Sequence, residues 1–191
     1  FVKLEFKKRR DGKDYLCLFF SGPIRSAGGT ATAVTLLVAD YVRKELGFDS
    51  YDPTEDEIKR AYIDVRDYHE RVTNLQYYPS EEEVLFLIRN YPLQIDGDTS
   101  DKIEVSNYKD LPRIGTNYLR SGFSLVVAEC FAQKSKKVNA QLQKWGNDFG
   151  LEHWSFLKEF LIIQEKIKAG LKKADIKDVK IVPDYTYIKD M

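Results

Sequence analysis

The sequence predicts an α+β fold that is mostly helical, with a small antiparallel β-hairpin sheet packed against about five helices. Three observations indicate this class. Two strand-like runs near the start of the chain flank a hairpin turn signal, a helical run follows them, and two capping boxes then precede further helical runs. With 43% hydrophobic and 31% charged residues, the 191-residue chain can bury the core of one ordinary domain.

The first two strands are predicted close to the N-terminus. Residues 2–7 (VKLEFK) alternate apolar and charged side chains, which is typical of a half-buried strand. Residues 15–20 (YLCLFF) form a continuous apolar run, which indicates a strand covered on both faces. Between them, Asp11 and Gly12 form a hairpin turn signal, so the three segments together predict a β-hairpin.

Helices are predicted next. Apolar residues recur at helical spacing over residues 34–46, and Gly47 is expected to end that helix. Residues 54–57 (TEDE) and 80–83 (SEEE) are capping boxes, in which a hydroxyl side chain and a glutamate satisfy free backbone N–H groups at a helix start. Each box precedes a periodic apolar run and therefore predicts a helix.

The second half of the chain carries weaker signals. Residues 93–105 are expected to be extended, with a turn at residues 96–98 (DGD). A long helix is predicted over residues 117–144, and a last helix over residues 152–166. After Gly170 the apolar pattern weakens, apart from a short extended piece at residues 179–182, so we expect one domain at residues 1–166 and a linker at residues 167–191.

Charge and cysteine content limit the classes of function. The net charge is zero, so any nucleic-acid contact is expected to use a local patch or a larger assembly. Cys17 and Cys130 lie far apart in apolar surroundings, which favours two buried reduced thiols in a cytoplasmic protein. No apolar run approaches the roughly 18–20 residues of a membrane span. Because the first residue is Phe1, we expect a fragment of a longer protein.

The turn at residues 21–30 (SGPIRSAGGT) is the first candidate site. It joins a buried strand to a helix start, where free N–H groups, flexible glycines and a guanidinium could together hold an anion. It has neither the P-loop nor the dinucleotide-binding pattern, and a tight turn that glycines merely permit is the competing interpretation. The residues expected at this site are Arg25, Ser26, Gly28, Gly29 and Thr30.

The same turn carries a family resemblance. Residues 21–47, SGPIRSAGGTATAVTLLVADYVRKELG, resemble a segment near the N-terminus of the large subunit of the archaeal D-family DNA polymerase. The resemblance continues through YDPTEDEI, LQYYP, RNYPLQID, DLPRIGTN, LRSG and AECFAQK, and it covers roughly residues 3–166. One departure is Gly122, which stands alone at the start of the predicted long helix where the family often has two glycines.

The resemblance implies a function for the whole protein and a role for this part of it. The family is a two-subunit replicative polymerase, in which the large subunit synthesises DNA and the small subunit is a 3′–5′ exonuclease. This chain would then be a non-catalytic N-terminal domain, similar to a KH-like module, that supports assembly and contacts the DNA backbone. Its partners would be DNA, the small subunit and the other domains of the large subunit, and its linker would lead toward a catalytic barrel.

The resemblance also implies that magnesium serves the whole enzyme and that this fragment holds no cofactor and no catalytic residue. Two alternatives stay open. The chain could be a purely structural assembly domain without DNA contact, or a free-standing phosphate-binding enzyme that uses Arg25.

Further basic residues are candidates for backbone contacts. Arg113, Asn117 and Arg120 flank the predicted start of the long helix, and Lys134 lies along it. Lysine clusters at residues 7–10, 134–137 and 166–173 are more simply interpreted as solvated faces.

Other polar residues favour structural interpretations. Asp96 and Asp98, with Asp101 and Glu104, could suggest a metal site, but their spacing does not fit a calcium loop and a solvated acidic hairpin is favoured. His69 lies on the apolar face of its predicted helix, which favours a packed histidine. His153 has no partner that the sequence identifies.

Overall fold

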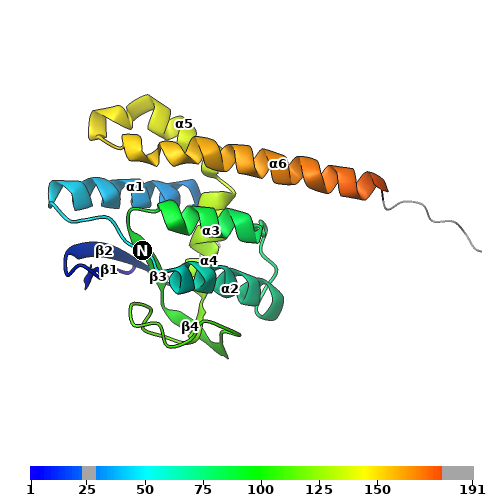
Figure 1. Cartoon of the computed structure of the whole chain (residues 1–191), viewed down its shortest axis with the longest axis horizontal. Coiled ribbons are helices and arrows are strands. Elements are labelled where there is room, and N and C mark those ends of the chain that lie inside the picture. The colour runs from blue at the N-terminus through cyan, green and yellow to red at the C-terminus, as the bar shows by residue number, and fades with distance from the viewer. Residues whose placement is uncertain (23–28, 178–191) are drawn as a thin grey trace, which may run out of the picture.

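The computed structural model of the chain describes residues 1–22 and 29–177. Figure 1 shows the arrangement: small sheets lie on one side, α1, α2, α3 and α4 pack next to them, and α5 and the long α6 cover the other side. The predicted α+β class, mostly helical with small strand sheets, is confirmed. The likeness to a KH module stays a prediction.

The N-terminal hairpin forms as predicted. Strands β1 (Lys3–Lys8) and β2 (Asp14–Phe20) pair antiparallel, and Gly12 in the connecting turn has a φ of 85°, which favours glycine. β2 is the central strand, and five of its seven residues are buried. A third strand, β3 (Gln94–Gly97), pairs parallel with β2, so the sheet is mixed rather than a hairpin alone.

The predicted turn at residues 96–98 is wrong. Asp96 and Gly97 end β3, the chain passes Asp98, and β4 (Thr99–Glu104) then pairs antiparallel with β5 (Tyr118–Arg120) in a second sheet. Asp96 is 2% exposed, because Lys7 and Arg120 neutralise its carboxylate. The expected acidic hairpin is therefore a junction of two sheets, in which Asp96 is buried while Asp98 and Glu104 are exposed as predicted.

The first three helices agree with the sequence signals. They are α1 (Gly29–Glu45), α2 (Glu55–Arg71) and α3 (Glu81–Asn90). Both predicted capping boxes are present; in the first, Glu57 N donates to Thr54 Oγ1 at 3.2 Å and Thr54 N donates to the Glu57 carboxylate at 2.8 Å. Gly47 follows α1 with a φ of 71°, as expected of a glycine that ends a helix.

The single long helix predicted for residues 117–144 is wrong. Its first residues form β5, and the rest divides into α4 (Ser121–Leu125), a π-helix η1 (Val126–Ala132) and α5 (Ser135–Trp145). Lys134, with a φ of −103° and a ψ of 5°, leaves the helical conformation between η1 and α5. The apolar spacing is the same in all three segments, which explains why the sequence suggested one helix.

The chain then turns back along itself. Two short 3-10 helices, η2 (Asn147–Phe149) and η3 (Glu152–Ser155), lead into α6 (Phe156–Lys177). α6 continues through the predicted boundary between residues 166 and 167 without a break. Residues 178–191, including the extended piece expected at 179–182, lie outside the described residues, so the division into domain and linker stays a prediction.

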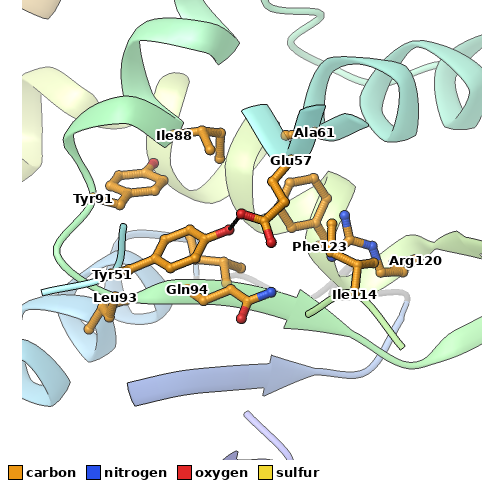
Figure 2. A pocket seen from close by; sticks show the side chains of 11 residues that line it. Tyr51, Glu57, Ala61, Ile88, Tyr91, Leu93, Gln94, Ile114, Arg120 and Phe123 are labelled. Atoms are coloured by element: carbon orange, nitrogen blue, oxygen red, sulfur yellow. Dashed lines mark hydrogen bonds between the residues drawn. The ribbon is translucent and has the colours of Figure 1, made fainter. Parts of the chain in front are cut away.

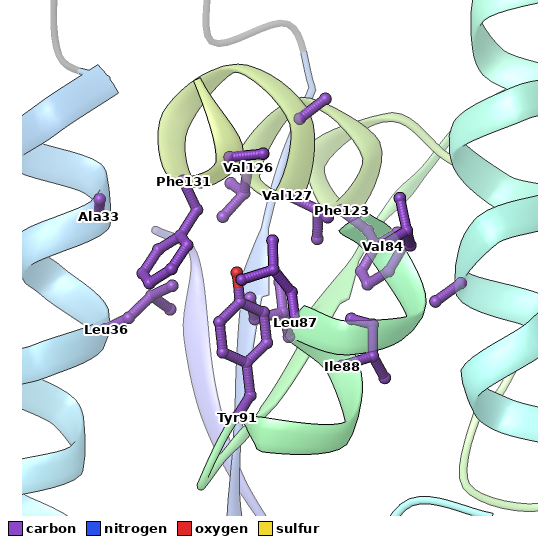
Figure 3. Close-up of a cluster of buried hydrophobic side chains, with 14 of the residues drawn as sticks. Ala33, Leu36, Val84, Leu87, Ile88, Tyr91, Phe123, Val126, Val127 and Phe131 are labelled. Atoms are coloured by element: carbon purple, nitrogen blue, oxygen red, sulfur yellow. The ribbon is translucent and has the colours of Figure 1, made fainter. Parts of the chain in front are cut away.

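One large apolar cluster holds the layers together. Figure 3 shows its centre, where side chains of α1, α3, α4 and η1 meet. Tyr91 packs edge-on against Phe131 with ring centroids 5.0 Å apart, and Trp154 packs 5.8 Å from Phe131. Within the described residues, no helix is both long and apolar enough to span a bilayer.

Candidate nucleic-acid interface

The backbone packs very closely where the turn at residues 21–30 begins. A Cβ atom at Gly122 would lie 2.0 Å from the carbonyl oxygen of Phe20. A Cβ atom at Gly97 would lie 2.7 Å from the backbone nitrogen of Phe123 and 3.2 Å from the same carbonyl. The start of α4 and the ends of β2 and β3 therefore touch through backbone atoms, and the single glycine at 122 is sufficient for this contact.

The other end of the turn lies beside the end of the π-helix. A Cβ atom at Gly29 would lie 3.6 Å from Lys134 Cε and 3.6 Å from the carbonyl oxygen of Glu129. The structure therefore brings together three of the predicted site residues, Gly29, Thr30 and Lys134, at the start of α1. Arg25, Ser26 and Gly28 lie outside the described residues, and nothing tests their predicted role.

The π-helix η1 sets the position of Lys134. π-helical turns are rare and occur frequently at functional sites. Here η1 directs the Glu129 carboxylate to the backbone nitrogen of Gln76, which donates to it at 2.8 Å, and buries Cys130. Burial raises the pKa of the Cys130 thiol to about 11, and that of the Cys17 thiol to about 12. Both cysteines are thus buried free thiols, as predicted.

Basic side chains without carboxylate partners are frequent in the chain after η1. Residues 134–170 contain seven lysines and four carboxylates. Within the described part of the chain, no carboxylate lies within 4.0 Å of Lys134, Lys136, Lys137 or Lys158, and the last three are exposed. By contrast, the cations of the N-terminal hairpin all lie in ion pairs: Lys3, Lys7, Lys8, Arg9, Arg10 and Lys13. We call Lys134, Lys136, Lys137 and Lys158 the lysine surface.

Arg113 is already held by carboxylates. Its Nε donates to Glu57 Oε1 at 2.8 Å, it also pairs with Asp52, and its guanidinium lies 5.2 Å from the centre of the Tyr51 ring. Burial lowers the pKa of the Arg113 guanidinium, but the bonds to Glu57 and Asp52 outweigh it and raise the pKa overall. A phosphate would have to compete with both carboxylates for this side chain.

Arg120 is a core residue. It is 1% exposed, and its two terminal nitrogens donate to Asp96 Oδ1 at 2.8 Å and to Asp64 Oδ2 at 2.5 Å. Arg60 donates to the same Asp64 oxygen at 3.1 Å. The Arg120 guanidinium is therefore inaccessible to a DNA backbone in this structure. The Asn117 side chain donates to Asp110 Oδ1 at 2.7 Å and lies at the exposed end of β5.

Figure 2 shows the small internal pocket next to Arg120, which is lined by side chains of α2, α3 and β3. Inside it, the Tyr51 hydroxyl donates to Glu57 Oε2 at 3.2 Å. The enclosed space of about 20 Å³ is the size of one water molecule and too small for a nucleotide. Because this pocket is part of the packed core, it offers no ligand site.

The acidic cluster and the two histidines were the remaining candidates for a functional site, and their contacts in the structure show how each is used. Among the described residues, no group of three or more histidine, cysteine or acidic side chains could hold a metal ion. His69 accepts a hydrogen bond from the backbone nitrogen of Leu75 at 3.0 Å and stacks 4.2 Å from Tyr78, so it is packed as predicted, but it is half-buried and lies outside the core. His153 lies 2.5 Å from Asp40 Oδ2, a partner too distant in sequence to identify from spacing.

Comparisons with known proteins identify the family of the chain. A family model described as "DNA polymerase II large subunit DP2, N-terminal" matches residues 1–163. A protein named DNA polymerase II large subunit from Nanoarchaeum equitans is 54% identical over 171 residues, which are 89% of this chain and 14% of the relative. Proteins of the same name from Thermococcus kodakarensis and Pyrococcus horikoshii are 44% and 42% identical over 91% and 96% of this chain.

These matches define the class of protein: the chain resembles large subunits of archaeal DNA polymerases. Within that class, the chain belongs to the family of N-terminal regions of the DNA polymerase II large subunit DP2. The resemblance identified from residues 21–47 is thereby confirmed. The chain spans only 9–14% of the length of these three relatives.

Proposed function

We propose that this chain is a non-catalytic accessory domain of an archaeal replicative DNA polymerase, and that its lysine surface contacts the DNA backbone. The observation that carries the proposal is the contrast in pairing: Lys134, Lys136, Lys137 and Lys158 have no carboxylate partner among the described residues, whereas the cations of the hairpin do. Unpaired lysines bind phosphates by displacing counterions, so their contacts position DNA without reading its sequence.

The start of α1 supports the same surface. Gly29 and Thr30 begin a helix whose first backbone N–H groups have no partner within the helix, and Lys134 lies against Gly29. Arg25, Ser26 and Gly28 precede this helix in the chain, so the predicted turn would add its groups next to the lysine surface. Arg113 and Arg120 are not part of the proposed contact, because carboxylates hold them both.

For the whole protein we propose the activity that the relatives' names describe, DNA-directed DNA synthesis. A magnesium-dependent catalytic centre elsewhere in the large subunit, and a small subunit with 3′–5′ exonuclease activity, complete the proposal. Support comes from the family membership of this chain. In this arrangement, the domain serves assembly through its neighbours and holds DNA through its lysines.

The DNA contact can be tested by a salt titration. The variant Lys134→Gln, Lys136→Gln, Lys137→Gln should bind duplex and primer–template DNA more weakly. Its plot of log affinity against log salt should be shallower by roughly 2–3, because about 0.9 counterions are released for each phosphate contact. Fluorescence anisotropy between about 50 and 200 mM salt measures both quantities.

A matched control separates local contact from net charge. The variant Lys3→Gln, Lys8→Gln, Lys13→Gln removes the same charge from lysines that are already ion-paired. It should leave the salt slope nearly unchanged. If the unaltered chain fails to bind at low salt, or if both triple variants lose affinity equally, the DNA contact is wrong and a purely structural assembly domain is the better description. Arg25→Ala tests the turn separately by the same measurement.

A further inference from the structure

Helix α1 has an outward face that is apolar and uncovered. Val38 and Val42 lie four residues apart on this face, are 54% and 39% exposed, and are followed by Leu46 at 56%. Residues spaced by four share one side of a helix. The opposite side of α1 faces the core through Ala33, Leu36 and other buried residues. Within residues 1–22 and 29–177, no segment covers the face that carries Val38 and Val42.

The composition of α1 differs from that of the other surface helices. Its first eleven residues, 29–39, contain no charged residue. The exposed positions of α2 and α3, in contrast, are charged or amide side chains such as Glu55, Lys59 and Glu82. A helix that faces water usually carries charge on its outer side, and a helix that is apolar all round is normally enclosed by protein. The first eleven residues of α1 therefore have the composition of an enclosed helix.

The apolar surface continues past the end of α1. The backbone nitrogen of Phe48 donates to the Arg43 carbonyl at 3.0 Å, which folds Phe48 back against the helix end. Phe48 in turn packs against Phe6 of β1, with ring centroids 5.0 Å apart, and Phe6 is 58% exposed. We call Val38, Val42, Leu46 and Phe6 the α1 strip. It links a helix face to the edge strand of the sheet.

We propose that the α1 strip is the docking face for an apolar segment of the remainder of the large-subunit polypeptide. This inference deepens the assembly part of the proposed function and rests on it. The chain aligns with only 9–14% of its relatives' length, so most of their mass lies elsewhere on the same polypeptide. A segment tethered on the same chain acts at a high effective concentration, which favours it over a separate molecule.

The absence of charge on the α1 strip also indicates which kind of partner it can bind. None of its four side chains is charged, so it offers nothing to DNA phosphates or to an acidic peptide. Asp40 and Arg43 of α1 are buried and paired with each other, so the exposed charges of the helix are Lys44 and Glu45 at its end, and Lys44 already donates to the Gly150 carbonyl. An uncharged, apolar surface is complementary to another apolar surface, as in contacts between domains that stay together.

Thiol labelling tests the docking directly. Val38→Cys and Val42→Cys are introduced separately into the 191-residue chain and into the full-length large subunit, and the extent of maleimide labelling of each peptide is followed by mass spectrometry. In the 191-residue chain both thiols should react at the rate of an exposed cysteine. In the full-length subunit both should react at least about tenfold more slowly, because reaction then needs local opening.

Two thiols in the shorter chain calibrate the rates. Glu82→Cys, at an exposed position of α3, sets the fast limit, and native Cys17, which is buried with a raised pKa, sets the slow limit. Equal labelling of Val38→Cys in the two contexts would overturn the proposal. So would protection in the 191-residue chain that grows with its concentration, since the occupant would then be a second copy. The DNA titration described above does not depend on this result, so either proposal can fail alone.

Discussion

Arg120 is the charged side chain on which the interior most depends. It joins Asp64 of α2 to Asp96 of β3, while Arg60 shares Asp64. Its guanidinium also lies 4.2 Å from the centre of the Phe123 ring. A buried ion network of this kind adds little net stability compared with an apolar core, but removing one partner leaves the others uncompensated.

We expect Arg120→Met to lower the free energy of unfolding by about 3–5 kcal/mol, because Asp64 and Asp96 would remain buried without their shared cation. Urea unfolding followed by circular dichroism measures this change. Arg89→Met is the control: Arg89 pairs with exposed Glu55 at the surface and should cost less than about 1 kcal/mol. Similar losses in the two variants would contradict the role given to Arg120.

Asp40 gives the stability a pH dependence. Burial acts to raise the pKa of its carboxyl, but hydrogen bonds from His153, Arg43 and Trp154 outweigh burial, and the pKa is lowered overall. A carboxyl whose pKa is lowered by folding stabilises the fold fully when the pH is above its pKa in the unfolded chain, which is about 4. This contribution is lost as the pH falls through the pKa of the carboxyl in the folded protein. Asp40 should therefore stabilise the protein fully at neutral pH.

Asp40→Asn should destabilise the protein by about 1–3 kcal/mol at pH 7, and the difference from the unaltered chain should shrink below about pH 4. Urea titrations at a series of pH values from neutral to acidic give this comparison. A difference that stays constant with pH would assign the loss to packing rather than to ionisation of the carboxyl.

At the scale of elements, the contact between α4 and β2 depends on one glycine. A side chain at position 122 would meet the Phe20 carbonyl at 2.0 Å, and backbone atoms cannot move aside as a flexible side chain can. Gly122→Ala should therefore lower the free energy of unfolding by at least about 3 kcal/mol. Thermal unfolding followed by circular dichroism provides the measurement.

The control for this prediction is another helical glycine. A Cβ atom at Gly170 in α6 would meet nothing within 4 Å, so Gly170→Ala should be neutral or stabilise by about 0.5–1 kcal/mol through helix propensity. If the two variants change stability equally, the close contact at Gly122 does not constrain the fold.

The sequence identified elements whose signals are local. The hairpin and the two capped helices were predicted because their turn and cap residues lie within a few positions of one another. β3 and β4 lie in the segment that was expected to be extended, but their pairing was not predicted, and β5 was missed. Their partners lie far along the chain: β3 pairs with β2, and β4 pairs with β5 across a long loop. The division of the long helix at Lys134 has no local signal either, since apolar spacing continues through η1.

The same distinction applies to the candidate site. Gly29, Thr30 and Lys134 were selected from the sequence and lie together, whereas Arg120 was selected as a surface cation and is buried. Its two carboxylate partners come from α2 and β3, and no spacing rule connects three such segments. The pairing of His153 with Asp40 was missed for the same reason.

At the scale of the molecule, a net charge of zero conceals an uneven distribution. Residues 1–133 carry 18 basic and 22 acidic residues, whereas residues 134–170 carry seven lysines and four carboxylates. Most of the described cations in residues 1–133 lie in ion pairs, whereas exposed lysines of residues 134–170 such as Lys136 and Lys137 have no described carboxylate partner. Composition alone argues against a DNA-binding protein, yet a local patch is sufficient for backbone contact.

The pairing of β2 with distant segments also determines the order in which the chain can fold during its synthesis. β2 leaves the ribosome well before β3, with which it pairs, and α4, which packs against it. At about 5–20 residues per second, roughly a hundred further residues must be made, over about 5–20 seconds, before both neighbours exist. During that interval the apolar strand β2 lacks these neighbours, which makes the nascent hairpin prone to aggregation.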